Sequence, residues 1–237
     1  MAAEPVGYLL SLALPKHDFD RENWVKEFST GLQENQSRFN WRLWGGDTVS
    51  TTGPITISVT AIGLVEQGKV ISRSTAKSGD SIYVSGTLGD AAGGLEVIRQ
   101  DLNADKYQYL VDRYYVPQPR LELANALSEL VTSMMDISDG LLGDLGHICE
   151  NSSVGADVFS QKIPLSASFG NLLETKGQYS HLPWSGGDDY ELLFTLSQED
   201  DDQMLALSKK LNVKLTKIGK ITDGQNIRLL DGDGAEI

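Results

Sequence analysis

Residues 134–144 (Met-Met-Asp-Ile-Ser-Asp-Gly-Leu-Leu-Gly-Asp) constrain the fold of this 237-residue chain more than any other stretch. An apolar run delivers two carboxylates, Asp136 and Asp139, and apolar residues then recur at helical spacing. This change of period predicts a strand-to-helix junction with both carboxylates at the turn. A helix cap formed by Ser138 or Asp139 would explain one polar residue but leaves Asp136 unexplained. A cap and a metal or phosphate site therefore both remain open for this stretch.

Strand and helix periods alternate along the rest of the chain, which is typical of an α/β or α+β protein. Strands are expected near 6–14, 39–43, 55–61, 82–85, 156–159, 192–196, 214–221 and 226–230. Helices are expected over 21–37, 91–99, 105–114, 119–132, from 140 to about 150, and 199–211, with a long loop over 164–183. A polar segment at 73–80 predicts two domains, residues 1–74 and 75–237.

The composition narrows the possible partners. The net charge is −13 with no Lys/Arg cluster, which makes nucleic acid and anionic membrane surfaces poor partners. No apolar run reaches membrane-spanning length, and the first residues lack the basic start of a signal peptide. The single cysteine, Cys149, fits a reducing, cytoplasmic compartment, and its place on an apolar helix face predicts a buried thiol rather than a nucleophile. In so acidic a chain, carboxylates can hold a phosphate only through divalent cations.

Three stretches share one design, in which an apolar strand ends, glycines open the backbone and a carboxylate stands at the turn. They are residues 45–48 (Gly-Gly-Asp-Thr), 136–140 (Asp-Ile-Ser-Asp-Gly) and 186–189 (Gly-Gly-Asp-Asp). Carboxylates supply the hard oxygen ligands that Mg²⁺ prefers beside substrate phosphates. One such turn is common on protein surfaces. Three in one chain favour a shared metal–phosphate site.

Other sources of chemistry are weaker. The glycine-rich residues 86–94 lack the Gly-Lys-Ser/Thr of a phosphate-binding loop and the Gly-x-Gly-x-x-Gly fingerprint of dinucleotide binding, so tight packing of a helix against its strand is favoured there. The three histidines are scattered without metal-ligand spacing, which argues against a zinc site. No Gly-x-Ser-x-Gly elbow is present, which argues against a serine hydrolase. Arg73 is either a solvated charge or the direct partner of phosphate oxygens.

The motifs together resemble those of the thiamine-monophosphate kinase family, in the superfamily that includes aminoimidazole ribonucleotide synthetase and selenophosphate synthetase. The matching stretches are residues 45–48, 73–80, 83–90, 136–141, 144–148 and 186–192. They run in family order across nearly the whole chain. The pair formed by Asp-Ile-Ser-Asp-Gly and Gly-Gly-Asp-Asp-Tyr-Glu separates this family from its superfamily relatives, so the resemblance is specific.

The resemblance implies a two-domain, PurM-like α/β architecture of mixed sheets packed with helices. It also implies phosphorylation of thiamine monophosphate to thiamine diphosphate by ATP, through direct in-line transfer with several Mg²⁺ ions and without a protein nucleophile. A homodimer with ATP near the subunit interface is expected as well.

Carried over by position, the resemblance makes Asp47, Asp136 and Asp139 ligands of Mg²⁺. The expected contacts to ATP are Gly46, Asp47, Arg73 and Ser138. Asp188 would contact thiamine monophosphate, at a position where the family often has Glu.

Two departures leave alternatives open. Residues 1–5 resemble an internal family segment, so we expect the family's N-terminal portion, with further metal-binding aspartates, to be missing from this chain. The chain also stops before the family's C-terminal aromatic residue that packs on thiamine; Trp184 could stack on a ring but is expected in the core. The alternatives to the kinase are another ATP-using member of the superfamily and an inactive module that binds nucleotide or dimerises.

Overall fold

Contacts divide the chain into two compact units. The computed structural model describes residues 2–17 and 19–237. The smaller unit is Ala3–Gly68, and the larger one contains Ala2 and Lys69–Ile237. The expected boundary near residue 74 stays a prediction about the family's domains, because these units are defined by contacts alone. Within the described residues, no helix is long and apolar enough to cross a membrane.

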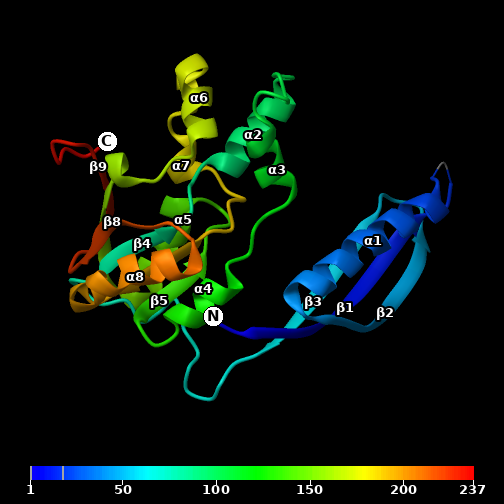
Figure 1. Cartoon of the computed structure of the whole chain (residues 1–237), viewed down its shortest axis with the longest axis horizontal. Coiled ribbons are helices and arrows are strands. Elements are labelled where there is room, and N and C mark those ends of the chain that lie inside the picture. The colour runs from blue at the N-terminus through cyan, green and yellow to red at the C-terminus, as the bar shows by residue number, and fades with distance from the viewer. Residues whose placement is uncertain (1, 18) are drawn as a thin grey trace. The chain divides into compact units, whose positions relative to one another are not determined.

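The smaller unit is a three-stranded sheet with one helix packed on it (Figure 1). Its elements are β1 (Glu4–Pro15), α1 (Arg21–Phe39), β2 (Arg42–Thr51) and β3 (Thr56–Leu64). The strand order is β2-β1-β3, with β2 parallel and β3 antiparallel to β1. Helix α1 begins where the Asp20 side chain accepts a hydrogen bond from the Asn23 N–H, an N-cap that satisfies one free donor of the first turn.

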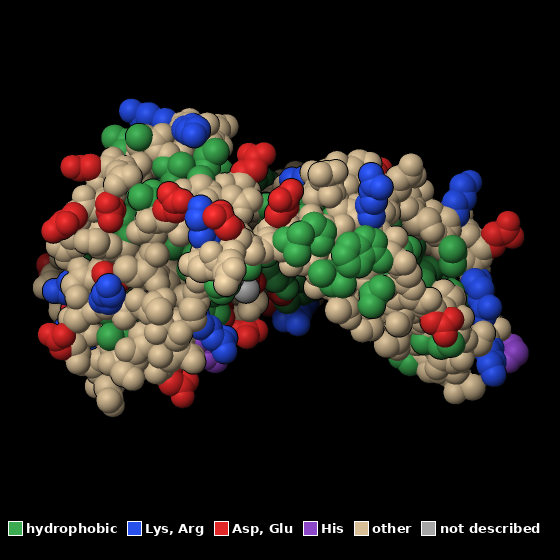
Figure 2. Space-filling view, turned by 90° about the horizontal axis from the view of Figure 1, so that it is seen from below, with side chains coloured by type: hydrophobic (Ala, Val, Ile, Leu, Met, Phe, Trp, Pro, Cys, Tyr) green, Lys and Arg blue, Asp and Glu red, His purple; other side chains and the backbone are tan. Residues whose placement is uncertain are grey.

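Buried and exposed side chains alternate along β1, and the buried ones form the core of this unit. Every second residue of the strand, Tyr8, Leu10 and Leu12, is buried against α1, whose apolar side chains recur four residues apart. These helical side chains are Trp24, Phe28 and Leu32. Other large hydrophobic side chains of this unit remain exposed, and Figure 2 shows them gathering on its surface. They include Leu9, Leu43, Trp44, Val49, Ile57, Val59 and Leu64.

The structure corrects the expected turn at residues 45–48, because β2 runs straight through it. Asp47 pairs with Ser11 in the parallel ladder, and the register shifts where Leu43 and Gly45 face Tyr8 and Leu9, leaving Trp44 as the extra residue of a bulge. A Cβ on Gly46 would lie 1.7 Å from the Leu10 carbonyl oxygen, so only glycine fits there. The two glycines therefore serve a bulged strand and not a strand end.

The larger unit is built on a six-stranded sheet of order β5-β7-β4-β8-β6-β9, antiparallel except for the pair β6 and β9. The strands are β4 (Ser81–Ser85), β5 (Val131–Asp136), β6 (Gly155–Phe159), β7 (Leu192–Leu196), β8 (Leu215–Thr222) and β9 (Ile227–Leu230). The helices are α2 (Asp90–Arg99), α3 (Gln108–Tyr115), α4 (Leu121–Leu127), α5 (Leu141–Ser152), α6 (Ala167–Thr175), α7 (Leu182–Ser185) and α8 (Asp201–Leu211).

Both faces of this sheet are buried. On one face Val84, Met135 and Leu193 pack in the cluster that includes α5, while on the other Tyr83 and Phe194 pack with α4 and α8. Because successive strand residues point to opposite faces, the apolar runs read continuously instead of alternating. A third cluster joins α2, α3 and α6. The expected α/β class with mixed sheets is confirmed.

Two expected elements are wrong. The helix expected over 119–132 ends at Leu127, and Val131 already pairs with Leu196 in the sheet. Pairing with β7 therefore overrides the local helical pattern. The loop expected over 164–183 contains α6, which begins where Ser166 Oγ accepts the Phe169 N–H at 3.0 Å. That serine cap was the available signal for the missed helix.

Candidate active site

Two of the three acidic motifs meet where two neighbouring strands of the larger sheet, β5 and β7, respectively end and begin. Asp136 ends β5, and residues 186–191 lead into β7, the neighbouring strand. The loops continue the pairing beyond the strands: the Tyr190 N–H donates to the Ile137 carbonyl at 2.9 Å and the Asp188 N–H to the Ser138 carbonyl at 3.0 Å. Residues 136–140 and 186–191 are thus one pair of hydrogen-bonded loops.

The loops approach so closely that glycine is required. A Cβ on Gly187 would lie 2.3 Å from the Ser138 carbonyl oxygen, which is backbone and cannot move aside. Asp188 and Tyr190 both have positive φ, 68° and 50°, a left-handed conformation that non-glycine residues rarely adopt. Such conformations persist only where surrounding contacts hold them, and they occur often at functional sites.

Three predicted carboxylates act on one phenol here, one of them by direct contact. Tyr190 Oη donates to Asp188 Oδ1 at 3.2 Å. Burial, and then the negative charges of Asp188, Asp136 and Asp139, raise the pKa of the Tyr190 phenol. Asp139 is exposed, whereas Asp136 and Asp188 are half-buried. The structure therefore brings together Asp136, Asp139 and Asp188.

The donor set suits Mg²⁺ only in part. Carboxylate oxygens are its preferred protein ligands, but no group of three or more His, Cys, Asp or Glu in the described part of the chain is arranged to hold a metal ion. Mg²⁺ commonly binds through one or two carboxylates, keeping waters and substrate phosphate oxygens as its other ligands. These residues fit that open kind of site and not a closed protein cage.

A side-chain cap by Ser138 or Asp139 is not formed. The N-cap of α5 is Gly140, with no side-chain cap. Instead Asp144 Oδ2 accepts the Ser138 N–H at 2.9 Å and the Asp139 N–H at 3.0 Å. Asp144 is only 1% exposed, and burial raises its pKa. Sequence reasoning missed this residue, although an acidic side chain in the first turn of a helix was a signal.

A second internal carboxylate occupies the start of α2. Asp189 accepts the Gly89 N–H at 2.6 Å and the Ala91 N–H at 3.0 Å. Two of the backbone donors that a phosphate cradle at residues 86–94 would use, those of Gly89 and Ala91, are therefore already bonded. A Cβ on Gly94 would lie 2.1 Å from the carbonyl oxygen of Leu110 in α3, so this glycine lets α2 pack closely against another helix, and not against its strand as the sequence had favoured.

Asp189 makes stability depend on pH. Burial raises its pKa from 3.8 to about 7, so between these values the folded protein holds a proton that the unfolded chain has lost. The contribution of protonated Asp189 to the unfolding free energy is therefore fully present below about pH 4 and is lost as pH rises through 7. Between pH 4 and pH 7 the unfolding free energy of the wild type should therefore decrease as pH rises. In Asp189→Asn we expect the slope of this decrease to be smaller by up to about 1.4 kcal/mol per pH unit. Urea unfolding from pH 4 to 7.5 measures it, with the exposed Asp105→Asn as control; parallel slopes for all three proteins would contradict the assignment.

Comparisons with known proteins identify the family. The N-terminal domain model of AIR synthase related proteins matches residues 1–65, and the C-terminal domain model matches residues 77–232. A thiamine-monophosphate kinase of Haemophilus influenzae is 43% identical over 226 residues, covering 94% of this chain and 67% of that protein. The chain belongs to the thiamine-monophosphate kinase family.

Solved thiamine-monophosphate kinases share the fold. The crystal structure of the enzyme from Stenotrophomonas maltophilia superposes with a TM-score of 0.91 at 38% identity, covering 100% of this chain and 74% of that one. The structure described as AaThiL complexed with AMPPCP and TMP superposes with a TM-score of 0.87 at 29% identity, covering 100% and 72%. The expected family and PurM-like architecture are confirmed.

The remaining residues that the thiamine-monophosphate kinase resemblance assigns lie elsewhere. Gly46 and Asp47 belong to the smaller unit, where Asp47 is exposed on β2 and its Oδ1 accepts the Thr48 N–H at 2.8 Å. Arg73 is exposed in the larger unit, and its carbonyl accepts a bond from Ser152 at the far end of α5 from Ser138. Arg73 and Ser138 are therefore not brought to one point of the larger unit.

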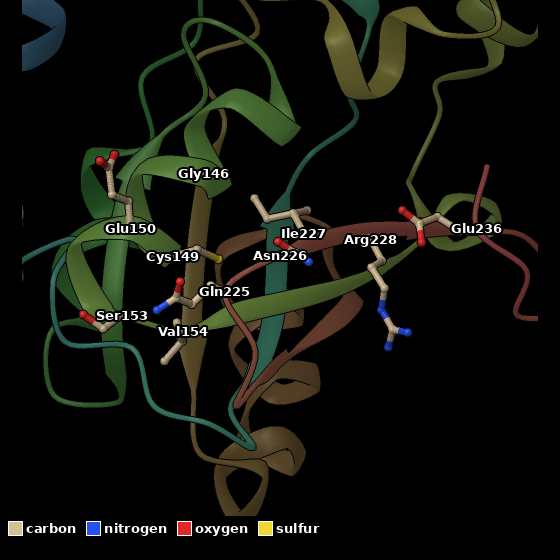
Figure 3. Close-up of a pocket in the computed structure, with 10 residues that line it drawn as sticks. All are labelled: Gly146, Cys149, Glu150, Ser153, Val154, Gln225, Asn226, Ile227, Arg228 and Glu236. Atoms are coloured by element: carbon tan, nitrogen blue, oxygen red, sulfur yellow. The ribbon is translucent and has the colours of Figure 1, made fainter.

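A separate cavity of about 620 Å³ lies between the C-terminal half of α5 and β9 (Figure 3). Its lining includes Cys149, Glu150, Asn226 and Arg228, and none of the residues that the family resemblance assigns. Burial raises the pKa of the Cys149 thiol to about 11, which keeps it protonated near neutral pH. The expected buried thiol is confirmed.

Trp184 lies close to the substrate-side motif but is a core residue. It belongs to the short helix α7, is half-buried and packs against the cluster that contains α5. This agrees with the expected core position.

Proposed function

We propose that this chain transfers the terminal phosphoryl group of ATP to thiamine monophosphate, forming thiamine diphosphate and ADP. The observation that carries the proposal is the pair of loops that gathers Asp136, Asp139 and Asp188 at one sheet edge. Two comparisons support this pair of substrates. The chain belongs to the thiamine-monophosphate kinase family, and a structural neighbour is complexed with AMPPCP and TMP.

We infer that the reaction needs Mg²⁺, because the backbone donors beside the site are already used. The N–H groups of Ser138 and Asp139 are held by Asp144, and those of Gly89 and Ala91 by Asp189. The loops also carry the carboxylates of Asp136, Asp139 and Asp188, whose negative charges would repel a polyphosphate without bound cations. Bound Mg²⁺ would neutralise phosphate oxygens, with Asp136 and Asp139 as proposed ligands in the larger unit. Asp47 is proposed as a Mg²⁺ ligand in the smaller unit.

The remaining roles follow from the family resemblance and not from the distances in the structure. Ser138, Gly46, Asp47 and Arg73 are proposed to contact ATP, and Asp188 the thiamine monophosphate. Transfer is proposed to be in-line: an oxygen of the acceptor phosphate forms a bond to the γ-phosphorus as the bond to the β,γ-bridging oxygen breaks. Such a reaction requires positioning and charge neutralisation rather than a protein nucleophile.

We further propose a homodimer as the active form and the cytoplasm as its compartment. Support for the dimer comes from the large hydrophobic side chains that the smaller unit leaves exposed, such as Trp44 and Leu64. The unpaired Cys149 suits a reducing compartment.

Direct assay tests the function. We expect thiamine diphosphate to form from thiamine monophosphate, ATP and Mg²⁺, and not when Mg²⁺ is chelated. Aminoimidazole precursors and selenide serve as competing acceptors, so that turnover with one of them would favour another superfamily activity. Turnover by this 237-residue chain would reject the inactive-module alternative. A folded chain that forms no thiamine diphosphate from these substrates and Mg²⁺ would overturn the proposal.

A further inference from the structure

The loop before β7 alternates between outward and inward side chains. Asp188 and Tyr190 lie on the side of the proposed substrates, whereas Asp189 and Glu191 are each only 1% exposed. The two inward carboxylates are the anchors of a loop whose outward residues have the strained, left-handed backbone. Neither anchor has a proposed role in binding ATP, Mg²⁺ or thiamine monophosphate. The Glu191 carboxylate accepts four hydrogen bonds, whereas that of Asp189 accepts two.

A clamp of donors fixes Glu191. Arg120 binds it in a bidentate manner, with Nε 2.8 Å from Oε2 and Nη2 2.6 Å from Oε1. Arg113 Nη2 lies 3.2 Å from Oε1, and Ser85 Oγ donates to Oε2 at 2.5 Å. All four carboxylate contacts are thus charge-assisted hydrogen bonds, the strongest class in proteins.

The clamp is linked by direct bonds to both active-site loops. The Glu191 carbonyl accepts the Ile137 N–H at 2.8 Å, and the Tyr190 N–H donates back to the Ile137 carbonyl. The Leu192 N–H donates to Ser85 Oγ at 2.8 Å, which fixes the residue that follows Glu191. Moving the Glu191 side chain would therefore shift the backbone that carries Asp188 and meets residues 137–138.

We propose that Arg120 is a positioning residue for the phosphoryl transfer, acting through Glu191 to hold Asp188 and Tyr190 against Ile137. The inference rests on the proposed function for its kinetic consequence but not for its structural one. Arg120 is the testable member of the clamp. Its side chain is 25% exposed, whereas Arg113 is buried and also donates to the Asp189 carbonyl, so that its removal would break a second contact.

A purely structural role is the competing explanation. A buried ion pair is by itself weak evidence for stabilisation, since desolvation offsets much of the attraction. The chain offers a matched control in Arg228, which also binds a carboxylate in a bidentate manner, with Nε and Nη2 2.8 and 2.9 Å from the two Asp157 oxygens. Arg228→Met removes a similar ion pair from the same unit without touching either loop.

Amide hydrogen exchange tests the positioning without requiring activity. In Arg120→Met we expect the Asp188 and Tyr190 amides to exchange about tenfold faster or more, with β4 and β8 unchanged and no such effect in Arg228→Met. Arg120→Lys keeps the charge but loses the planar fork, so it should lie between wild type and Arg120→Met. If Arg120→Met does not fold, the Arg120→Lys result decides. Loop exchange unchanged in the folded variants overturns the proposal.

Kinetics give the second readout, at a temperature well below each variant's melting point. We expect kcat/KM for thiamine monophosphate to fall about 10–100-fold in Arg120→Met, with a smaller change in KM for ATP and none in Arg228→Met. A lower Tm with unchanged kinetic parameters would overturn the proposal in favour of a structural role. If wild type shows no turnover, the proposed function fails, while the exchange experiment still decides the positioning.

Discussion

Asp139→Asn is expected to lower the rate of thiamine diphosphate formation by about 10²–10³-fold while leaving the melting temperature in the absence of metal unchanged. Within the described residues the Asp139 carboxylate accepts no hydrogen bond, and its N–H is held by Asp144 whatever the side chain. The substitution therefore removes a charge without removing a structural contact. Initial rates at increasing Mg²⁺ concentration and a thermal scan in chelator measure the two effects.

The exposed Asp223→Asn, in the turn between β8 and β9, is the matched control for the loss of one carboxylate. It should leave both the rate and the Mg²⁺ dependence unchanged. If Asp139→Asn retained most of the activity at every Mg²⁺ concentration, Asp139 would not be a metal ligand. A large fall in melting temperature would instead mean that its side chain supports the start of α5.

Gly187→Ala is expected to damage both the stability of the protein and its activity, because it forces the two loops of the site apart. The added Cβ would stand 2.3 Å from the Ser138 carbonyl oxygen, so the two loops would have to separate. We expect a loss of stability of about 1–3 kcal/mol, typical of overpacking, and a fall in activity of more than about 100-fold, since a shift near 1 Å misplaces Asp188 and Ser138 together. Urea unfolding and the kinase assay measure the two losses.

Gly143→Ala is the control for this change. Gly143 lies exposed in α5 with nothing within 4 Å of an added Cβ, so alanine should stabilise the helix by up to about 1 kcal/mol and leave activity intact. Equal behaviour of the two variants would show that the close approach of the loops does not matter.

The sequence alone predicted the elements with long, regular periods. The strand before Asp136, the helix after it and the amphipathic helix of Trp24 and Phe28 are all confirmed. A strand buried on both faces leaves a continuous apolar run, and a helix that buries one face leaves a helical period. Where tertiary pairing competed with that pattern, as at Val131, the prediction was wrong. The bulge at Trp44 was also missed, because its only signal, two glycines before a carboxylate, is shared with turns.

The candidate site divides in the same way. The sequence by itself determined the family and the outward carboxylates Asp136, Asp139 and Asp188, because they stand in short contiguous motifs. Only the tertiary structure decided which residues hold those motifs in place. Glu191 meets Arg120 across 71 positions, and Asp189 meets Gly89 across 100. Such pairs leave no periodic trace, since a hydrogen bond between distant residues depends on how the sheet is ordered and not on local spacing.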